Sequence, residues 1–179
     1  MKQPLWVQYR LESSEVTSGI ARRSNNFSFD PAVVGGSSFP DDYSKSGYDR
    51  GHLAPAADMH WSTNAMNESF LMSNMSPQTP QLNRHVWAAI ETFTRNQAKV
   101  EESVVVVSGP IATNAVPRRI GKSEDIVVPD AFYKVVYDET PPCKIVAFIV
   151  PNNNTLSQDI ASYVVAATNV EAIARVELF

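Results

Sequence analysis

Apolar and polar residues alternate at the start of the chain. Between positions 6 and 11 the sequence reads Trp-Val-Gln-Tyr-Arg-Leu, which puts Val7, Tyr9 and Leu11 on one face. An alternation with a period of two predicts a half-buried strand. Residues 13–47 are polar and interrupted by glycine and proline, and we predict that they are mostly loop. A loop of this length in a compact domain is usually functional or mobile.

A second apolar pattern, now with helical spacing, follows Thr79. Thr79 is a good N-cap, and Pro80 stands at the first helical position, where proline is tolerated. The spacing predicts one apolar face of a long amphipathic helix that ends near Lys99. The residues of this face stand at i, i+4, i+7, i+8 and i+11: Leu82, Val86, Ala89, Ile90 and Phe93.

Shorter segments complete the pattern. Ser62 is placed to cap a short helix that runs through Asn67, and the apolar residues 70–72 predict a brief buried strand. Four consecutive valines at 104–107 are typical of a strand buried on both faces. The Ser-Gly-Pro sequence at 108–110 is expected to end that strand.

The rest of the chain predicts further strands and a terminal helix. Strands are predicted at 131–137, 144–150 and 163–165. Thr-Asn-Val-Glu at 168–171 has the form of a capping box and predicts a short helix after it. The whole pattern predicts an α+β fold with a central, mainly antiparallel β-sheet.

Composition adds limits to this picture. The 179 residues show no linker, and we predict a single domain over 1–179. No apolar run approaches the roughly 20 residues that span a bilayer, so no membrane association is expected. No basic and then apolar leader follows Met1, so no secretory signal is expected in this sequence. Cys143 is the only cysteine, which excludes an internal disulfide.

The formal net charge of −4 argues mildly against a nucleic-acid partner. Phosphate binding depends on local patches, however, and cations do cluster in this sequence. The third cluster lies in a stretch that we predict to be loop. The clusters are Arg22 with Arg23, Lys45 with Arg50, and Arg118 and Arg119 with Lys122.

The tetrapeptide Asp49-Arg50-Gly51-His52 carries the sharpest chemical signal. An imidazole titrates near neutrality, so His52 is a candidate general base, with activity rising through a pH of about 6.5. Gly51 would let a substrate approach the backbone closely. Arg50 offers a planar fork that suits the paired oxygens of a phosphate, and a surface ion pair with Asp49 is the alternative.

Three more residues are candidates for the same site. Asn83 lies in the first turn of the long helix, and its amide oxygen is a hard, neutral ligand that suits Mg²⁺ or Ca²⁺. Glu91, eight positions later, falls within about 80–90° of the same helix face and is placed to reach metal-bound waters. Asn74 is a candidate for orienting a water or the scissile phosphate. A zinc site made by His52, His60 and His85 is disfavoured, because their spacing matches no zinc pattern.

Three blocks in this order carry a resemblance. They are Asp49-Arg50-Gly51-His52, the Ser-Asn-Met-Ser-Pro-Gln sequence at 73–78, and Leu-Asn-Arg-His-Val-Trp at 82–87 followed by Glu91. Together they resemble the DNA/RNA non-specific endonuclease family, the ββα-metal or His-Me finger nucleases that include endonuclease G. The resemblance continues through the Val-Ser-Gly-Pro at 107–110 and covers most of the chain.

The resemblance implies a ββα-metal motif with one long active-site helix. It implies that His52 is the general base, that Asn83 is the direct Mg²⁺ ligand and that Arg50 contacts phosphate. Asn74 and Glu91 would hold the metal's water shell and the site geometry. The family also carries an upstream arginine, for which Arg23 is the candidate and Arg22 the alternative.

The expected function is therefore a metal-dependent, sugar-non-specific endonuclease with DNA and RNA as substrates and 5′-phosphorylated products. Mg²⁺ is the expected cofactor, with Mn²⁺ as a substitute. A homodimer and a protein inhibitor are candidate partners, and the resemblance favours a secreted or periplasmic location. Two alternatives stay open, a catalytically silent nucleic-acid-binding relative and the nuclease domain of a toxin or effector. Family members usually have a further strand and hairpin before residue 6, so this chain is either truncated or minimal.

Overall fold

A five-stranded antiparallel sheet forms the middle layer of the protein. The computed structural model describes residues 2–178. The strands lie in the order β1-β4-β7-β8-β9, and their bounds are β1 Val7–Glu12, β4 Ser103–Ile111, β7 Ala131–Asp138, β8 Lys144–Pro151 and β9 Val164–Val165. Every pairing is antiparallel. The predicted α+β fold with a central antiparallel sheet is confirmed.

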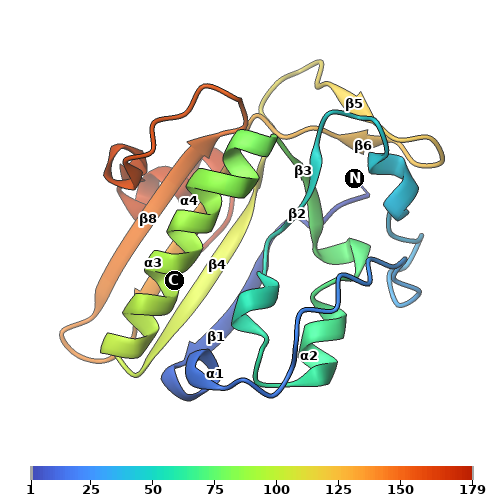
Figure 1. Cartoon of the computed structure of the whole chain (residues 1–179). Helices are drawn as coiled ribbons and strands as arrows, with labels where there is room; N and C mark the ends of the chain where they lie inside the picture. The colour runs from blue at the N-terminus through green and yellow to red at the C-terminus, as the bar shows by residue number, and fades with distance from the viewer. Residues whose placement is uncertain (1, 179) are drawn as a thin grey trace.

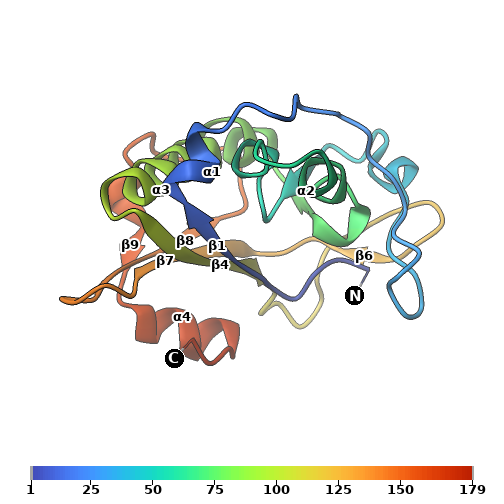
Figure 2. The same ribbon diagram turned by 90° about the horizontal axis from the view of Figure 1, so that it is seen from below.

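Helices cover the two faces of this sheet. Helix α3 (Ala88–Val100) lies on one face and helix α4 (Ala167–Ala174) on the other, as Figures 1 and 2 show. The largest apolar cluster lies between α3 and the sheet and includes Trp87, Phe132 and Phe148. A second cluster, with Tyr133 and Val170, lies beneath α4. The sheet is therefore packed on both faces, as a continuous apolar run predicts.

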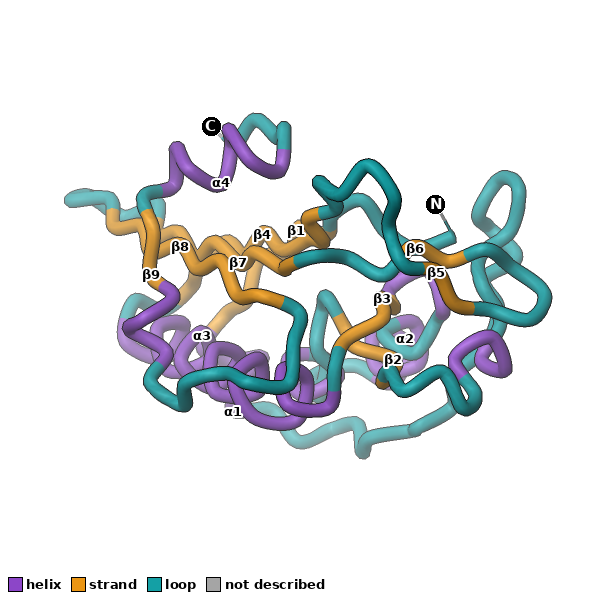
Figure 3. The backbone as a smooth tube through the Cα atoms, turned by 90° about the horizontal axis from the view of Figure 1, so that it is seen from above, coloured by secondary structure: helices purple, strands orange, loops and turns teal. Residues whose placement is uncertain are grey.

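Two short strands precede the long helix and form a separate ribbon. Strand β2 (Asp49–His52) pairs antiparallel with β3 (Met75–Gln78), and Gly51 lies opposite Ser76. Figure 3 shows this ribbon next to the helix and apart from the main sheet. The strand predicted at 70–72 is wrong. Phe70 and Met72 are buried, but the strand begins only at Met75, after a short 3-10 helix, η3 (Met72–Asn74).

The long helix begins as predicted but contains a wide turn. The hydroxyl oxygen of Thr79 accepts from the backbone N–H of Leu82 at 3.4 Å, which confirms the cap. Residues Leu82–Trp87 form a π-helical segment, η4, before α3 continues to Val100. The predicted face is confirmed at Leu82, Val86, Ile90 and Phe93. The wide turn adds Trp87 to the buried side, and Ala89, expected in the core, is exposed. Such π segments occur frequently at functional sites.

The long loop after β1 is more ordered than the sequence predicts. It contains helix α1 (Ser13–Thr17) and the 3-10 helix η1 (Pro40–Tyr43). Two backbone anchors hold the part between them. The N–H of Ala21 donates to the carbonyl of His60 at 2.8 Å, and Ser28 bridges to Leu71.

The segment between β2 and η3 contains only short helices. Residues 53–69 contain the 3-10 helix η2 (Ala56–Asp58) and helix α2 (Thr63–Glu68). Ser62 caps α2 through the N–H of Ala65, as predicted.

The basic stretch near residue 118 is a hairpin, not the loop that we predicted. Strands β5 (Arg119–Ile120) and β6 (Ile126–Val127) pair antiparallel. Strand β4 also continues through 108–110, where we expected it to end. The main chain is already extended there, and Gly109 accommodates the close approach of Tyr133 and Leu5.

The C-terminal helix does not begin with the capping box. Its N-cap is Ala166, with no side-chain cap, and the 3-10 helix η5 (Ile160–Tyr163) precedes strand β9. Glu171 instead accepts from the backbone N–H of Leu178 at 3.1 Å, so it binds the chain after the helix. The capping-box prediction is wrong, because tertiary contacts to the C-terminal segment outweigh a local signal of this size.

Gly51 is required for packing. A Cβ atom on Gly51 would lie 2.2 Å from the Oε1 atom of the buried Gln78 side chain. The expectation that this glycine makes room for substrate therefore needs correction, because the space is filled by the neighbouring strand. Gly51→Ala should lower the free energy of unfolding by about 1–3 kcal/mol through overpacking, as measured by urea unfolding.

A second substitution checks this cause. Gln78→Ala removes the atoms that the new methyl group meets, so the double variant Gly51→Ala/Gln78→Ala should be more stable than the sum of the two single effects predicts. Strictly additive losses would show that Gln78 is not the obstacle.

Candidate active site

A cavity of about 360 Å³ opens between the β2–β3 ribbon, the start of the long helix and the loop before β2. Five of the six side chains that the sequence singled out line it, and Asn74 does not. The charged and polar lining residues are Arg23, Asp49, Arg50, His52, Asn83 and Glu91.

His52 occupies an apolar position at the end of β2. The side chain is 8% exposed and packs edge-on against the rings of Phe27 and Phe70, with centroids 5.7 Å and 4.9 Å away. Its Nε2 atom is buried and finds no hydrogen-bond partner among the described residues. Burial, together with repulsion from Arg23, lowers the pKa of His52 to about 3. The ring is therefore a neutral, unprotonated imidazole at neutral pH.

Two arginines approach the cavity from different segments. The guanidinium of Arg50 stacks over the Phe27 ring at 4.2 Å, and it makes no hydrogen bond or ion pair among the interactions of residues 2–178. Arg23 stacks over Phe70 at 4.9 Å and donates from Nε to Asn25. The backbone anchors of the upstream loop bring Arg23 into the lining, whereas Arg22 is not part of it.

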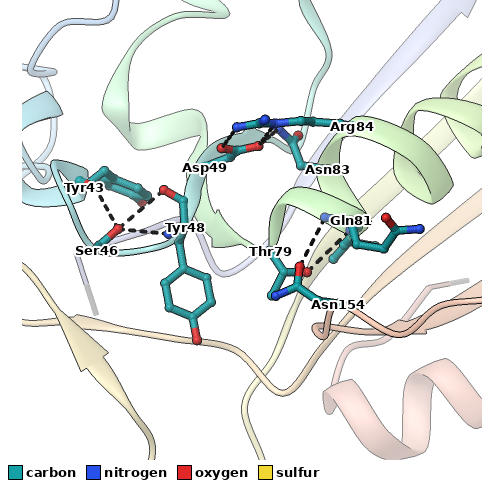
Figure 4. A network of polar contacts seen from close by, with 10 residues as sticks. Tyr43, Ser46, Tyr48, Asp49, Thr79, Gln81, Asn83, Arg84 and Asn154 are labelled. Atoms are coloured by element: carbon teal, nitrogen blue, oxygen red, sulfur yellow. Dashed lines mark hydrogen bonds and ion pairs between the residues drawn. The ribbon is translucent and has the colours of Figure 1, made fainter.

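Asp49 and Asn83 form one polar unit (Figure 4). Arg84 binds the Asp49 carboxylate with two hydrogen bonds, of 2.7 and 2.8 Å, so the alternative of an Asp49–Arg50 pair is not what the structure contains. The Asn83 amide nitrogen donates to the same carboxylate at 2.9 Å. The hydrogen bonds of Arg84 lead the effects that lower the pKa of Asp49, against partial burial. Because its nitrogen is used this way, Asn83 is left with its amide oxygen for another partner.

Glu91 lines the cavity one π segment further along the helix. A wide turn rotates less per residue than an α-helix, so it reduces the angle of about 80° that regular helical geometry gives between Asn83 and Glu91. Burial raises the pKa of Glu91 to about 7, while the buried ammonium of Lys134 opposes the shift and Asp58 adds to it.

Lys134 is a residue that sequence reasoning missed. It is fully buried in the middle of β7, where its ammonium donates to the carbonyl of Leu53 and to the hydroxyl of Ser108, each at 3.3 Å. The ammonium also lies 4.8 Å from the ring centre of Trp87. The one available signal was a lysine inside an otherwise apolar strand, which is rare without a partner.

Asn74 is tied to the backbone near His52. Its amide nitrogen donates to the carbonyls of Ala54 and Ser69, each at 2.8 Å, and its oxygen accepts from the N–H of Ala54 at 3.0 Å. These contacts hold the loop that follows His52. They leave the amide committed to the protein, and a role of Asn74 at water or phosphate stays a prediction.

The β2–β3 ribbon followed by the long helix is the ββα arrangement of the ββα-metal class of fold, and an imidazole, two guanidinium groups and an amide line one cavity beside it. The comparisons with known proteins agree. The family model for DNA/RNA non-specific endonucleases matches residues 1–179. The chain is 33% identical to a nuclease of Nostoc sp. over 94% of this chain and 64% of that protein. It is 34% identical to human mitochondrial endonuclease G over 83% of this chain and 54% of that protein.

A solved structure gives the same result. A chain of the complex between EndoG and EndoGI superimposes with a TM-score of 0.90 and 29% identity, over 99% of this chain and 78% of that one. The chain therefore belongs to the DNA/RNA non-specific endonuclease family. It spans 44–64% of the length of the first relatives it matches. None of the helices within residues 2–178 has the length and apolar character to cross a membrane.

The buried histidine makes stability depend on pH. A folded pKa of about 3 lies below the unfolded value of about 6.5, so the unfolded chain takes up a proton first as the pH falls. The contribution of His52 to the free energy of unfolding is therefore most favourable above about pH 6.5, and it becomes less favourable as the pH falls toward 3. In the His52→Asn variant, the free energy of unfolding measured with urea should fall less between pH 6 and pH 4 than it does in the parent protein.

His85 is the matched control, because it is an exposed histidine in the π segment of the long helix. His85→Asn should leave the slope unchanged. A titration of the His52 ring protons by NMR with a midpoint near 6.5 would contradict this account.

Proposed function

We propose that this chain is a divalent-metal-dependent endonuclease that hydrolyses the phosphodiester bonds of DNA and RNA and leaves 5′-phosphorylated products. The observation that carries the proposal is the neutral His52 imidazole beside the unpaired Arg50 guanidinium in one open cavity. In-line attack of water on phosphorus requires a base and a group that binds the phosphate, both held in fixed positions. The imidazole and the guanidinium on the β2–β3 ribbon can fill these two roles.

His52 accepts the proton of the attacking water. A base with a pKa near 3 is weak in the free protein, but a bound phosphate brings negative charge next to the ring. That charge offsets the repulsion from Arg23 and favours the imidazolium, so substrate binding raises the pKa of the base toward the working pH. The apolar contacts with Phe27 and Phe70 hold the ring in place during this step.

Arg50 and Arg23 bind the phosphate oxygens. Both guanidinium groups lie over aromatic rings, which help to hold them in position, and both residues line the cavity. Charge develops on the phosphate oxygens in the transition state, and preorganised donors stabilise it without having to reorganise.

The donor set of the cavity fits a hard cation. Among residues 2–178 no three His, Cys, Asp or Glu side chains gather into a group that could hold a metal ion. The Asn83 oxygen is the available ligand, because Asp49 holds the amide nitrogen, and Glu91 is in reach of waters in the same cavity. One neutral oxygen ligand with waters suits Mg²⁺, and Mn²⁺ should replace it. When bound, the ion acts as a Lewis acid toward the phosphate and the leaving oxygen.

The lining residues recognise phosphate and not sequence. Phosphate contacts carry no base information, and no lining side chain can be assigned to the 2′-hydroxyl that separates RNA from DNA. Duplex DNA, single-stranded DNA and RNA should therefore be cleaved at rates within about an order of magnitude, and increasingly slowly as salt is added.

A protein inhibitor is a reasonable partner for this cavity. One similar solved structure is a complex of EndoG with EndoGI that concerns the mechanism of EndoG inhibition. We propose that a protein inhibitor also binds this chain. The homodimer and the secreted or periplasmic location stay predictions.

The first test is a side-by-side digestion of plasmid DNA and RNA with Mg²⁺. His52→Ala should reduce both activities by at least about a hundredfold, the low end of general-base contributions. His85→Ala, an exposed histidine nearby, should retain both. Parental protein without activity on either substrate would favour the catalytically silent alternative, and an active His52→Ala would remove His52 from the mechanism.

The second test concerns the metal. Chelator should abolish cleavage while leaving the melting temperature unchanged, because a single neutral ligand with waters contributes little to folding. Asn83→Leu should raise the Mg²⁺ concentration that gives half-maximal rate. Melting of the protein on chelation would mean that the metal is structural and would contradict this role for Asn83.

A further inference from the structure

A second cavity, of about 320 Å³, adjoins the active site on the side of η1. Asp49 and Arg50 line both cavities, so the two meet at the residue that we assign to phosphate. The other lining residues come from the segment that precedes β2 and include Tyr43 and Tyr48. A nucleic acid strand whose scissile phosphate lies on Arg50 reaches this second cavity directly.

We propose that Tyr48 and Arg118 form a subsite at this cavity for the nucleotide next to the scissile phosphate, with its base stacked on Tyr48 and its outer phosphate on Arg118. The inference rests on the proposed function and deepens it. It also assigns a role to part of the basic stretch at 118–122, which the catalytic cavity leaves unused.

Tyr48 is held in a preformed position. The hydroxyl of Ser46 accepts from the backbone N–H of Tyr48 at 3.1 Å and donates to the carbonyl of Tyr43 at 2.7 Å (Figure 4). Gly47, with a φ of +85°, makes the tight turn between them. A rigid aromatic side chain loses little conformational entropy on binding, so it is well suited to stacking.

Arg118 is brought to Tyr48 by the β5–β6 hairpin. Its guanidinium lies over the Tyr48 ring at 5.1 Å, and it makes no ion pair with any described residue, while the adjacent Arg119 is paired with Asp125. Tyr48 lines the cavity and Arg118 does not. The guanidinium covers one face of the ring, and we assign the base to the other face, on the side of the cavity.

Asp42 joins the two parts of the subsite. Its Oδ1 atom accepts from the backbone N–H groups of Lys122, Ser123 and Glu124, in the turn of the hairpin. Its Oδ2 atom accepts from the N–H of Phe39, in the segment that leads to Tyr48. These hydrogen bonds outweigh the effect of burial and lower the pKa of Asp42. The hairpin and the Tyr48 loop are thus one unit at neutral pH.

Stacking on an aromatic ring suits a nuclease without sequence preference. Every base has a π face, so a stacking site accepts all four, and a guanidinium adds a contact to the backbone. The loss of one such stack is expected to weaken binding by about tenfold. Single-stranded DNA and RNA should use the site equally, because neither contact involves the sugar.

The test compares a 12-nucleotide strand with methyl 4-nitrophenyl phosphate, a diester without a base. Tyr48→Leu and Arg118→Gln should each lower the ratio of kcat/KM for the strand to kcat/KM for the diester by about tenfold, mainly through KM for the strand. Tyr48→Phe should retain the ratio, since it keeps the ring. Arg119→Gln is the matched control and should stay within twofold of the parent. Thermal melting confirms that each variant is folded.

An unchanged ratio in Tyr48→Leu would overturn the subsite, and so would an equal loss in Tyr48→Phe. A parent that cleaves neither substrate would instead overturn the proposed function. In that case binding still tests the subsite. With chelator and the His52→Ala variant, a strand carrying 2-aminopurine next to the bound phosphate should be quenched, and Tyr48→Leu should abolish the quenching. Unaltered quenching in that variant would again reject the subsite.

Discussion

The backbone carbonyls of His52 and Leu53 join the β2–β3 ribbon to the long helix and the main sheet. The indole of Trp87 donates to the carbonyl of His52 at 3.2 Å. The Ser108 hydroxyl and the Lys134 ammonium, both from the main sheet, donate to the carbonyl of Leu53. A buried carbonyl left without these donors would cost about 1–3 kcal/mol. The position of the base relative to the helix therefore depends on residues that never touch the cavity.

Local electrostatics explain how a chain with a net charge of −4 can face phosphate. Two acidic groups near the cavity are paired, Asp49 with Arg84 and Asp58 with Arg95. Burial raises the pKa of Glu91 to about 7, and Arg23 and Arg50 line the same cavity. A total charge says little about such a site, because screening limits each group to its own neighbourhood.

Five of the six residues that the sequence singled out line one cavity, and the predictions that failed have physical causes. Thr79 and Ser62 acted as caps because their effect is local. Four of the five residues predicted for the buried helix face are in the core, and only Ala89 is exposed, because a π segment leaves no mark in apolar spacing. Gly51 was interpreted as an approach for substrate, yet a side chain from the paired strand fills that space. The second failure involves a partner distant in sequence.

Local patterns in the sequence were enough to indicate the family and the layers: an imidazole, arginines and an amide stand in blocks whose order points to one family, and the periods of the strands and the helix predict the layers. Only the tertiary structure decided how those groups behave. It gave His52 an apolar environment that keeps it unprotonated and assigned the Asn74 amide to a loop. It also placed Arg118 over Tyr48. The burial of a side chain and the partners it finds depend on contacts between segments that are distant in sequence. Local sequence patterns carry no information about those contacts.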